Sequence, residues 1–248
     1  MRQATLSSGR LQFVSSTAST NADLLASVRG ALRVPEGEWL IADRQTAGRG
    51  RQGRHWQDGC GNFMGSTVIR LAPGDPAPAS LALVAGLALY EAVHTLLPRP
   101  VQLELKWPND LMVDGAKLAG ILLERAGDCV VAGFGVNLAH APAVAGRETA
   151  ALTRYGPAPN RDLFAATLAD SVAEELARWR TYGVEPVIRR WQTAAHPVGT
   201  RLTVLPPGES QLAGEFAGLA EDGSLRLALT SGETRLIRAG DVMLNRES

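Results

Sequence analysis

The chain has 248 residues, 45% of them hydrophobic, and its 25 basic residues balance its 25 acidic ones. This length can bury a sizeable core, and the formal net charge of zero argues against a broad basic face for nucleic acid. No apolar run reaches the roughly 18 residues of a membrane span, and the N-terminus lacks an apolar signal region. We therefore expect a cytoplasmic protein with no membrane contact. The two cysteines, Cys60 and Cys129, are far apart and in no C-x-x-C motif, so we expect free thiols.

The first hundred residues predict strands and helices around one loop. We expect an edge strand at residues 11–14, and a helix at residues 22–32 whose capping box pairs Thr20 with Asp23. Strands at 38–43 and 63–71 flank a loop at 45–62. The apolar stretch 79–97 is typical of a core helix buried on nearly all sides.

The middle of the chain predicts an antiparallel or mixed sheet. Residues 101–107 alternate between apolar and polar, which indicates a half-buried strand with Lys106 on its polar face. A hairpin follows, turning at Asp114-Gly115, and its second strand covers residues 117–125. A further strand is expected at 129–136. Because consecutive strands are joined by short turns, neighbours should run in opposite directions.

The last third predicts two helices and then a small β unit. The helix at 160–182 is amphipathic, with an apolar stripe that begins at Leu163, and a shorter helix covers 185–195. Four short strands are expected at 201–205, 212–219, 225–229 and 234–238, separated by turn residues. We therefore predict an α+β protein with two domains, residues 1–197 and a barrel-like appendage at 198–248.

The loop at residues 45–62 is the strongest candidate for a binding element. It holds five glycines and the arginines Arg49, Arg51 and Arg54, a composition suited to phosphate or carboxylate. Three of its glycines match the dinucleotide pattern G-x-G-x-x-G. That match is weak by itself, because the residues after it cannot open a helix. The sequence therefore predicts an anion-binding loop of another kind.

Two further groups of residues extend this candidate site. Only two basic residues are lysines, Lys106 and Lys117, and both lie in one segment that also contains Asp110. Lysine, arginine and aspartate together suit a nucleoside triphosphate with Mg²⁺, since the cations offset the phosphate charge and a carboxylate can hold the metal. Small residues in the neighbouring strands suit a flat, partly apolar second ligand.

The motifs GRGRQGRHW, KWPNDL, KLAGILLE and GFGVN, preceded by STN, resemble those of biotin protein ligases in order and spacing. The resemblance runs from about residue 13 to the C-terminus. It implies a catalytic domain related to class II aminoacyl-tRNA synthetases and an SH3-like C-terminal β-barrel. It also implies a two-step reaction, in which biotin and ATP form biotinyl-5′-AMP and a lysine of a biotin carboxyl carrier domain then takes the biotinyl group.

The resemblance also implies a role for each matching residue. Catalysis would rest on Lys117, Arg49 and Arg51. The biotin site would comprise Ser19, Thr20, Asn21, Gln45, Arg49, Gly50, Arg51 and Lys117. The ATP site would comprise Arg54, Trp56, Lys106, Asn109 and Asn137, with Asp110 on the Mg²⁺ side. ATP and Mg²⁺ are thus the expected co-substrate and metal, and a homodimer through an edge strand is possible.

Three other functions fit parts of the pattern. Some biotin ligases also repress transcription, but only about a dozen residues precede the core here, so we expect no nucleic-acid partner. Lipoate ligases and octanoyl transferases share the fold, although the loop motif favours biotin. A non-catalytic biotin-binding protein would not need the complete set of arginines and lysines.

Overall fold

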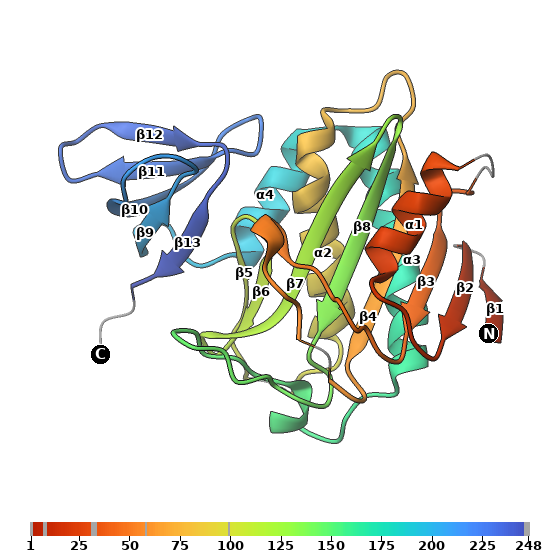
Figure 1. Ribbon diagram of the computed structural model, residues 1–248. Coiled ribbons are helices and arrows are strands. Elements are labelled where there is room, and N and C mark those ends of the chain that lie inside the picture. Colours follow the sequence, from red (N-terminus) through yellow and green to blue (C-terminus); the bar gives the residue numbers. More distant parts are fainter. Residues whose placement is uncertain (1, 7–8, 31–33, 58, 99, 246–248) are drawn as a thin grey trace.

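The computed structural model describes residues 2–6, 9–30, 34–57, 59–98 and 100–245, which form two sheets and four α-helices (Figure 1). The larger sheet has the strand order β1-β2-β3-β4-β8-β7-β6-β5. Its β2–β3 pair is parallel and its other pairs are antiparallel, so of the two predicted types, antiparallel or mixed, the sheet is mixed. Its strands are β1 Arg2–Leu6, β2 Gly9–Val14, β3 Glu38–Ala42, β4 Phe63–Arg70, β5 Leu103–Lys106, β6 Asp110–Val113, β7 Ala116–Ala126 and β8 Cys129–Val136.

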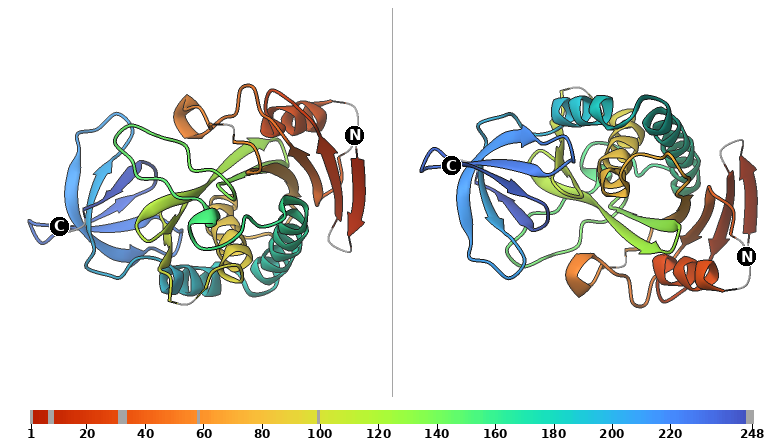
Figure 2. Two further views of the ribbon diagram at one scale, coloured as in Figure 1. Left: turned by 90° about the horizontal axis from the view of Figure 1, so that it is seen from below. Right: turned by 90° about the horizontal axis from the view of Figure 1, so that it is seen from above.

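The helices lie on both faces of this sheet. Helix α1 (Thr20–Arg29) contacts β3, β4, β7 and β8 on one face. On the other face lie α2 (Leu81–His94) and α3 (Arg161–Tyr182), with α4 (Val184–Ala194) beside α2 and β5, as Figure 2 shows. Short 3₁₀ turns occur at Arg51–Gly53, Pro78–Ser80 and Leu152–Arg154. No helix within the described ranges is long and apolar enough to cross a bilayer.

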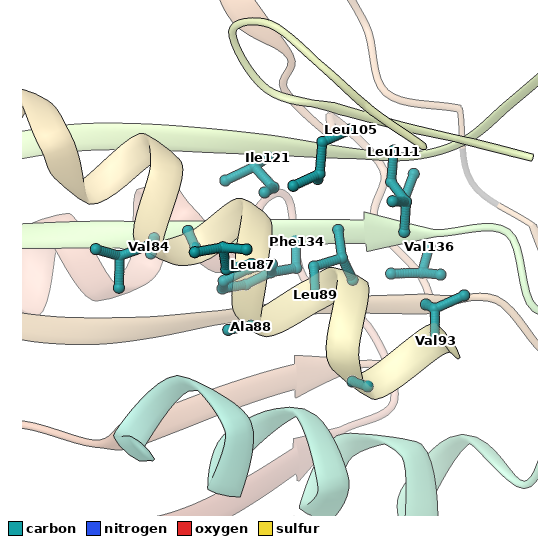
Figure 3. Packing of buried hydrophobic residues seen from close by; sticks show 14 of the residues in the cluster. Val84, Leu87, Ala88, Leu89, Val93, Leu105, Leu111, Ile121, Phe134 and Val136 are labelled. Carbon is teal, nitrogen blue, oxygen red and sulfur yellow. The ribbon is translucent and has the colours of Figure 1, made fainter. Parts of the chain in front are cut away.

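The core lies between the sheet and α2. This helix is apolar on nearly all sides because the sheet covers one side of it and α3 and α4 cover others. Phe134 and Val136 of β8 point toward α2 (Figure 3). Successive residues of a strand face opposite sides, so the alternating Gly133 and Gly135 face away from this core, toward α1. The glycines therefore lie on the face of the sheet that carries the candidate site.

The last strands form a second, antiparallel sheet in the order β12-β11-β10-β9-β13. They are β9 Arg201–Leu205, β10 Leu212–Leu219, β11 Leu225–Leu229, β12 Thr234–Ile237 and β13 Asp241–Leu244. Within the described chain the edges β12 and β13 are not paired, so the sheet is open rather than a closed barrel. Leu202 and Phe216 belong to the same apolar core as α2, and Trp107 Nε1 donates to Gly223 O at 3.1 Å. The two sheets are therefore packed together, and the division at residues 197 and 198 stays a prediction.

Several local predictions were wrong for physical reasons. The N-cap of α1 is Ser19, not Thr20, because the Ser19 hydroxyl accepts from Ala22 N. The apolar stripe of α3 excludes Leu163, which is 71% exposed. Strand β5 is buried on both faces rather than one. Helix α1 ends at Arg29, and the predicted end at residue 32 lies outside the described residues.

Candidate active site

The start of α1 meets the loop after β3 in a buried hydrogen-bond network. Gln45 Oε1 accepts from Thr20 N at 2.8 Å and from Thr20 Oγ1 at 3.1 Å. Asn21 Nδ2 donates to Glu124 Oε2 at 2.9 Å. Thr20, Asn21 and Gln45 are each buried. Amides and hydroxyls held in this way form a rigid polar surface suited to the carbonyl and N–H groups of a neutral ring.

Sequence reasoning missed Ser66, which completes this network from β4. Its hydroxyl donates to Asn21 Oδ1 at 2.6 Å and lies 2.7 Å from Thr20 Oγ1. The residue is fully buried. The available signal was a Ser-Thr pair inside an otherwise apolar strand, since a buried hydroxyl needs a partner.

The glycine- and arginine-rich loop folds as a small hairpin. Gly50 N donates to Arg54 O at 2.7 Å, and Trp56 N donates to Gly48 O at 2.9 Å. Gln52 and Gly53 turn the hairpin with φ of 56° and 72°. A Cβ at Gly48 would lie 2.7 Å from Trp56 O, so the close approach of the two arms requires glycine there.

The arginines at the tip of this hairpin reach two distant segments. The Arg51 guanidinium donates to Asn109 Oδ1 at 3.0 Å and to Gly240 O at 3.2 Å. Arg54 forms an ion pair with Asp241, the first residue of β13. The hairpin is thereby connected to both the β5–β6 turn and the C-terminal sheet.

The two lysines of the chain converge on one carboxylate. Lys106 Nζ lies 3.0 Å from Asp110 Oδ2, and Lys117 Nζ lies 2.5 Å from Asp110 Oδ1. All three side chains are largely buried, at 8–14% exposure. The convergence follows from the meander β5–β6–β7, in which Asp110 pairs with Lys106 on one side and with Gly120 on the other.

Burial and charge act against each other in this cluster. Burial alone would raise the pKa of Asp110, but the two ammonium groups outweigh it and lower the pKa to about 2. Burial lowers the pKa of Lys117 below its ordinary value, and Asp110 opposes that shift. Asp110 therefore acts as the shared counterion of two buried lysines.

This geometry does not fit the prediction that Asp110 holds Mg²⁺. Both of its oxygens accept from ammonium groups, so neither is available to an ion without breaking an ion pair. In the part of the chain that the structure describes, no group of three or more His, Cys, Asp or Glu side chains could hold a metal. The Mg²⁺ role of Asp110 therefore stays a prediction that this arrangement does not support, since local sequence cannot show which cations a carboxylate will meet.

Trp56 covers the flat glycine surface beside the lysines. Gly120 and Gly135 are cross-strand partners, and a Cβ at Gly135 would lie 2.3 Å from Trp56 Cε2. Lys117 Nζ is 5.8 Å from the centre of the indole. The glycines give room to a flat group, and in this structure that group is the protein's own indole, so the flat second ligand stays a prediction.

One cavity of about 480 Å³ brings together every residue that the motifs singled out. Asn137 lies at its wall, buried, with Nδ2 donating to Ala150 O at 3.0 Å. Sequence reasoning missed other parts of the lining, including Arg147 in the loop after β8, and Leu205, Asp241 and Met243 in the C-terminal sheet. The individual roles of the lining residues stay predictions.

Comparison with known proteins shows which family this chain resembles. The profile of the Biotin/lipoate A/B protein ligase family matches residues 12–137. A Paracoccus denitrificans biotin–[acetyl-CoA-carboxylase] ligase is 36% identical over 91% of this chain and 97% of its own. The Escherichia coli bifunctional ligase/repressor BirA is 34% identical over 84% of this chain and 66% of its own. A solved biotin protein ligase from Aquifex aeolicus, in complex with biotin and ATP, superposes with a TM-score of 0.82 at 26% identity, over 96% of this chain and 99% of that one.

Proposed function

This chain belongs to the biotin/lipoate A/B protein ligase family, and we propose that it is an ATP-dependent enzyme that joins biotin to a lysine of a biotin carboxyl carrier domain. In the first step a biotin carboxylate oxygen bonds to the α-phosphorus of ATP, and pyrophosphate leaves. In the second step the acceptor amine bonds to the carbonyl carbon of biotinyl-5′-AMP, and AMP leaves as the amine loses a proton.

One observation carries this proposal. A single cavity holds a buried neutral end, built on Thr20, Gln45 and Ser66, and a cationic end, built on Lys106 and Lys117. Biotin has the matching polarity, with a neutral ureido ring at one end and a carboxylate at the other. The polar network would hold the ring, so that the carboxylate points toward the lysines.

The lysines and loop arginines supply what the first step requires. A carboxylate and a phosphate about 4 Å apart repel each other by roughly 4 kcal/mol at an effective dielectric constant of about 20. Lys117 would lie close to both expected anions, since it lines the cavity beside the glycine pair. Fixed cations offset the repulsion and need no reorganisation as charge moves onto the leaving pyrophosphate.

Arg49, Arg51 and Arg54 would close over the nucleotide. Arg51 already spans from the hairpin to Asn109, which preorganises the loop. Magnesium belongs to this proposal only as part of the substrate MgATP, since Asp110 is engaged by lysines. Closure would also keep water from the mixed anhydride between the two steps.

The remaining parts of the proposal concern partners and location. The acceptor is the carrier domain of a biotin-dependent carboxylase, supported by the name of the Paracoccus denitrificans relative. Free cysteines at 60 and 129 support a reducing, cytoplasmic compartment. A homodimer and the lack of a nucleic-acid partner stay predictions.

Biotin-dependent exchange of pyrophosphate into ATP tests the first step, and mass spectrometry of a carrier domain after incubation with biotin and MgATP tests the second. Lys117→Ala should abolish exchange, whereas Arg226→Ala, at an exposed position outside the cavity, should leave it unchanged. Normal exchange by the Lys117 variant would remove this lysine from the mechanism. Exchange with lipoic or octanoic acid but not with biotin would replace the proposed substrate by another acid of the same family.

A further inference from the structure

A chain of hydrogen bonds leads into the neutral end of the cavity, and Glu124 of β7 lies at its outer end. Asn21 Nδ2 donates to Glu124 Oε2 at 2.9 Å, and Asn21 Oδ1 accepts from Ser66 Oγ at 2.6 Å. Ser66 Oγ lies 2.7 Å from Thr20 Oγ1. Asn21, Ser66 and Thr20 line the cavity, whereas Glu124 lies behind Asn21 and is not part of the lining.

We propose that Glu124 is a positioning residue that fixes the direction of this chain, and so determines which hydrogen-bonding groups the cavity offers to the biotin ring. This role rests on the proposed function and adds a specificity determinant to it. An ionised carboxylate only accepts hydrogen bonds, whereas an amide has a donating and an accepting end. Asn21 must therefore turn Nδ2 toward Glu124 and Oδ1 toward Ser66.

Packing alone does not select this orientation of the Asn21 amide. A Cβ at Gly133 would lie 2.2 Å from Asn21 Oδ1, so the amide lies flat against β8. The two ends of an amide are nearly the same size, so close packing fits either one. Leu122 O also accepts from Nδ2, but at the longer distance of 3.4 Å. The charged Glu124 acceptor at 2.9 Å therefore provides the stronger preference.

The orientation of Asn21 determines where each hydroxyl proton goes. A serine or threonine hydroxyl carries one proton. Because Ser66 donates its proton to Asn21 Oδ1, the 2.7 Å contact between Ser66 and Thr20 requires the proton of Thr20. Thr20 shares this proton with Gln45 Oε1 at 3.1 Å. Thr20 Oγ1 thus keeps its lone pairs and is an acceptor in the wall of the cavity.

This pattern of donors and acceptors matches a cyclic urea. The ureido ring of biotin carries N–H donors beside a carbonyl acceptor. Thr20 Oγ1 would accept from a ring N–H. Because Gln45 Oε1 accepts from Thr20 N at 2.8 Å, Gln45 Nε2 is the end that would donate to the ring carbonyl. If the chain ran in the opposite direction, the Thr20 proton would point at the ring N–H, and two donors would face each other.

The test compares Glu124→Gln with Glu124→Asp, and uses Glu215→Gln on β10 as the matched control. Glutamine keeps the size of Glu124 but can donate as well as accept, so Asn21 and the hydroxyls behind it can reverse. Aspartate still only accepts. Glu215 is exposed and outside the cavity lining. Titration calorimetry measures the affinity for biotin and for its cyclic carbamate analogues, in each of which one ring N–H is replaced by oxygen.

We expect the unsubstituted protein to bind biotin at least about tenfold more tightly than the carbamate whose ring oxygen meets Thr20, because two acceptors then face each other. Glu124→Gln should weaken biotin binding about fivefold and reduce this preference to about twofold or less, since Thr20 can then donate. Glu124→Asp should retain the preference, and Glu215→Gln should change neither quantity. The KM for MgATP of Glu124→Gln should stay within about twofold of the unsubstituted protein, which also shows that the variant folds.

A cycle with Ser66→Ala identifies the path of the effect. Removing the Ser66 hydroxyl already breaks the chain between Asn21 and Thr20. Adding Glu124→Gln to Ser66→Ala should therefore change the biotin affinity by less than about twofold. A residue that only supported the fold would instead add its full effect in both backgrounds.

Five results would overturn the proposal. An unsubstituted protein that binds biotin and both carbamates equally shows that Thr20 is not a fixed acceptor. An unchanged preference in Glu124→Gln shows that Asn21 is oriented without the carboxylate. The same loss of preference in Glu124→Asp shows that the acceptor character of the side chain does not matter. Equal weakening of biotin and MgATP makes Glu124 a residue of the fold. A full effect in the Ser66→Ala background places the path elsewhere.

The outcome for the unsubstituted protein separates this role from the proposed function. If that protein binds no biotin, the proposed function fails, and the role of Glu124 with it. If it binds biotin and only the Glu124 variants behave like it, the proposed function stands and the positioning role of Glu124 fails.

Discussion

Replacing Asp110 by Asn should lower the unfolding free energy of this protein, because two buried lysines lose their counterion. The substitution keeps the size of the side chain but leaves Lys106 and Lys117 without a counterion. The Lys106 and Lys117 ammonium groups lie 3.0 and 2.5 Å from the carboxylate, separations worth about 5–7 kcal/mol of attraction each at an effective dielectric constant of about 20. Much of that attraction offsets the cost of burying the charges, so we expect roughly 4 kcal/mol of lost unfolding free energy.

Urea unfolding at neutral pH measures this loss, and a second substitution identifies its cause. Adding Lys106→Met to Asp110→Asn removes one uncompensated charge, so the double variant should be more stable than the single one. A single variant within about 1 kcal/mol of the unsubstituted protein would refute the reasoning. So would a double variant that is less stable than the single one.

The pH dependence of the unfolding free energy tests the same cluster. The pKa of Asp110 is lowered from 3.8 to about 2, so its contribution is fully present above 3.8 and is lost as the pH falls toward 2. The shift corresponds to roughly 2 kcal/mol. The stability difference between the unsubstituted protein and Asp110→Asn should therefore shrink over this range, and a constant difference would contradict the assignment.

Three further substitutions follow from the cavity walls. Arg51→Gly removes the hydrogen bond from the hairpin to the β5–β6 turn. Biotinyl-5′-AMP should then escape from the open loop, and biotinylation of bystander proteins should rise. No increase would contradict a role of the loop in closure. Gly135→Ala places a Cβ 2.3 Å from the Trp56 indole, so the unfolding free energy measured in urea should fall by about 1–3 kcal/mol. Gly156→Ala serves as the control, because a Cβ there meets open space. Ser66→Ala removes a hydroxyl shared within the polar network, and titration calorimetry should show biotin binding weakened about tenfold; unchanged affinity would remove Ser66 from the site.

Short-range patterns in the chain predicted most of the elements. The limits of β8, β9, β10 and β11 agree with the predicted strands, because each is an apolar or alternating run that ends at turn residues. The Asp114-Gly115 turn was equally predictable, since it requires positive φ at both residues, and φ is 45° and 82° there. The motif residues that resemble a known family also predicted part of the lining of the cavity.

Strands β1 and β13 were missed for a common reason. Each is a short segment of four or five residues with no strong alternation, and it becomes a strand only by pairing with a neighbour. For β13 that neighbour, β9, lies more than thirty residues earlier in the chain. A local window contains no trace of such a partner, so Asp241 and Met243 could not be assigned to the site.

By itself, the sequence determined that the main sheet is antiparallel or mixed, that α2 is a core helix, and which motif residues line the cavity. These depend on periodicity and residue type, which act within a few neighbouring positions. Only the tertiary structure decided that Asp110 is the counterion of two lysines, that Ser66 joins the neutral end, and that the C-terminal sheet borders the cavity. Each of these depends on which charges and strands meet across long stretches of chain, and that is settled by packing.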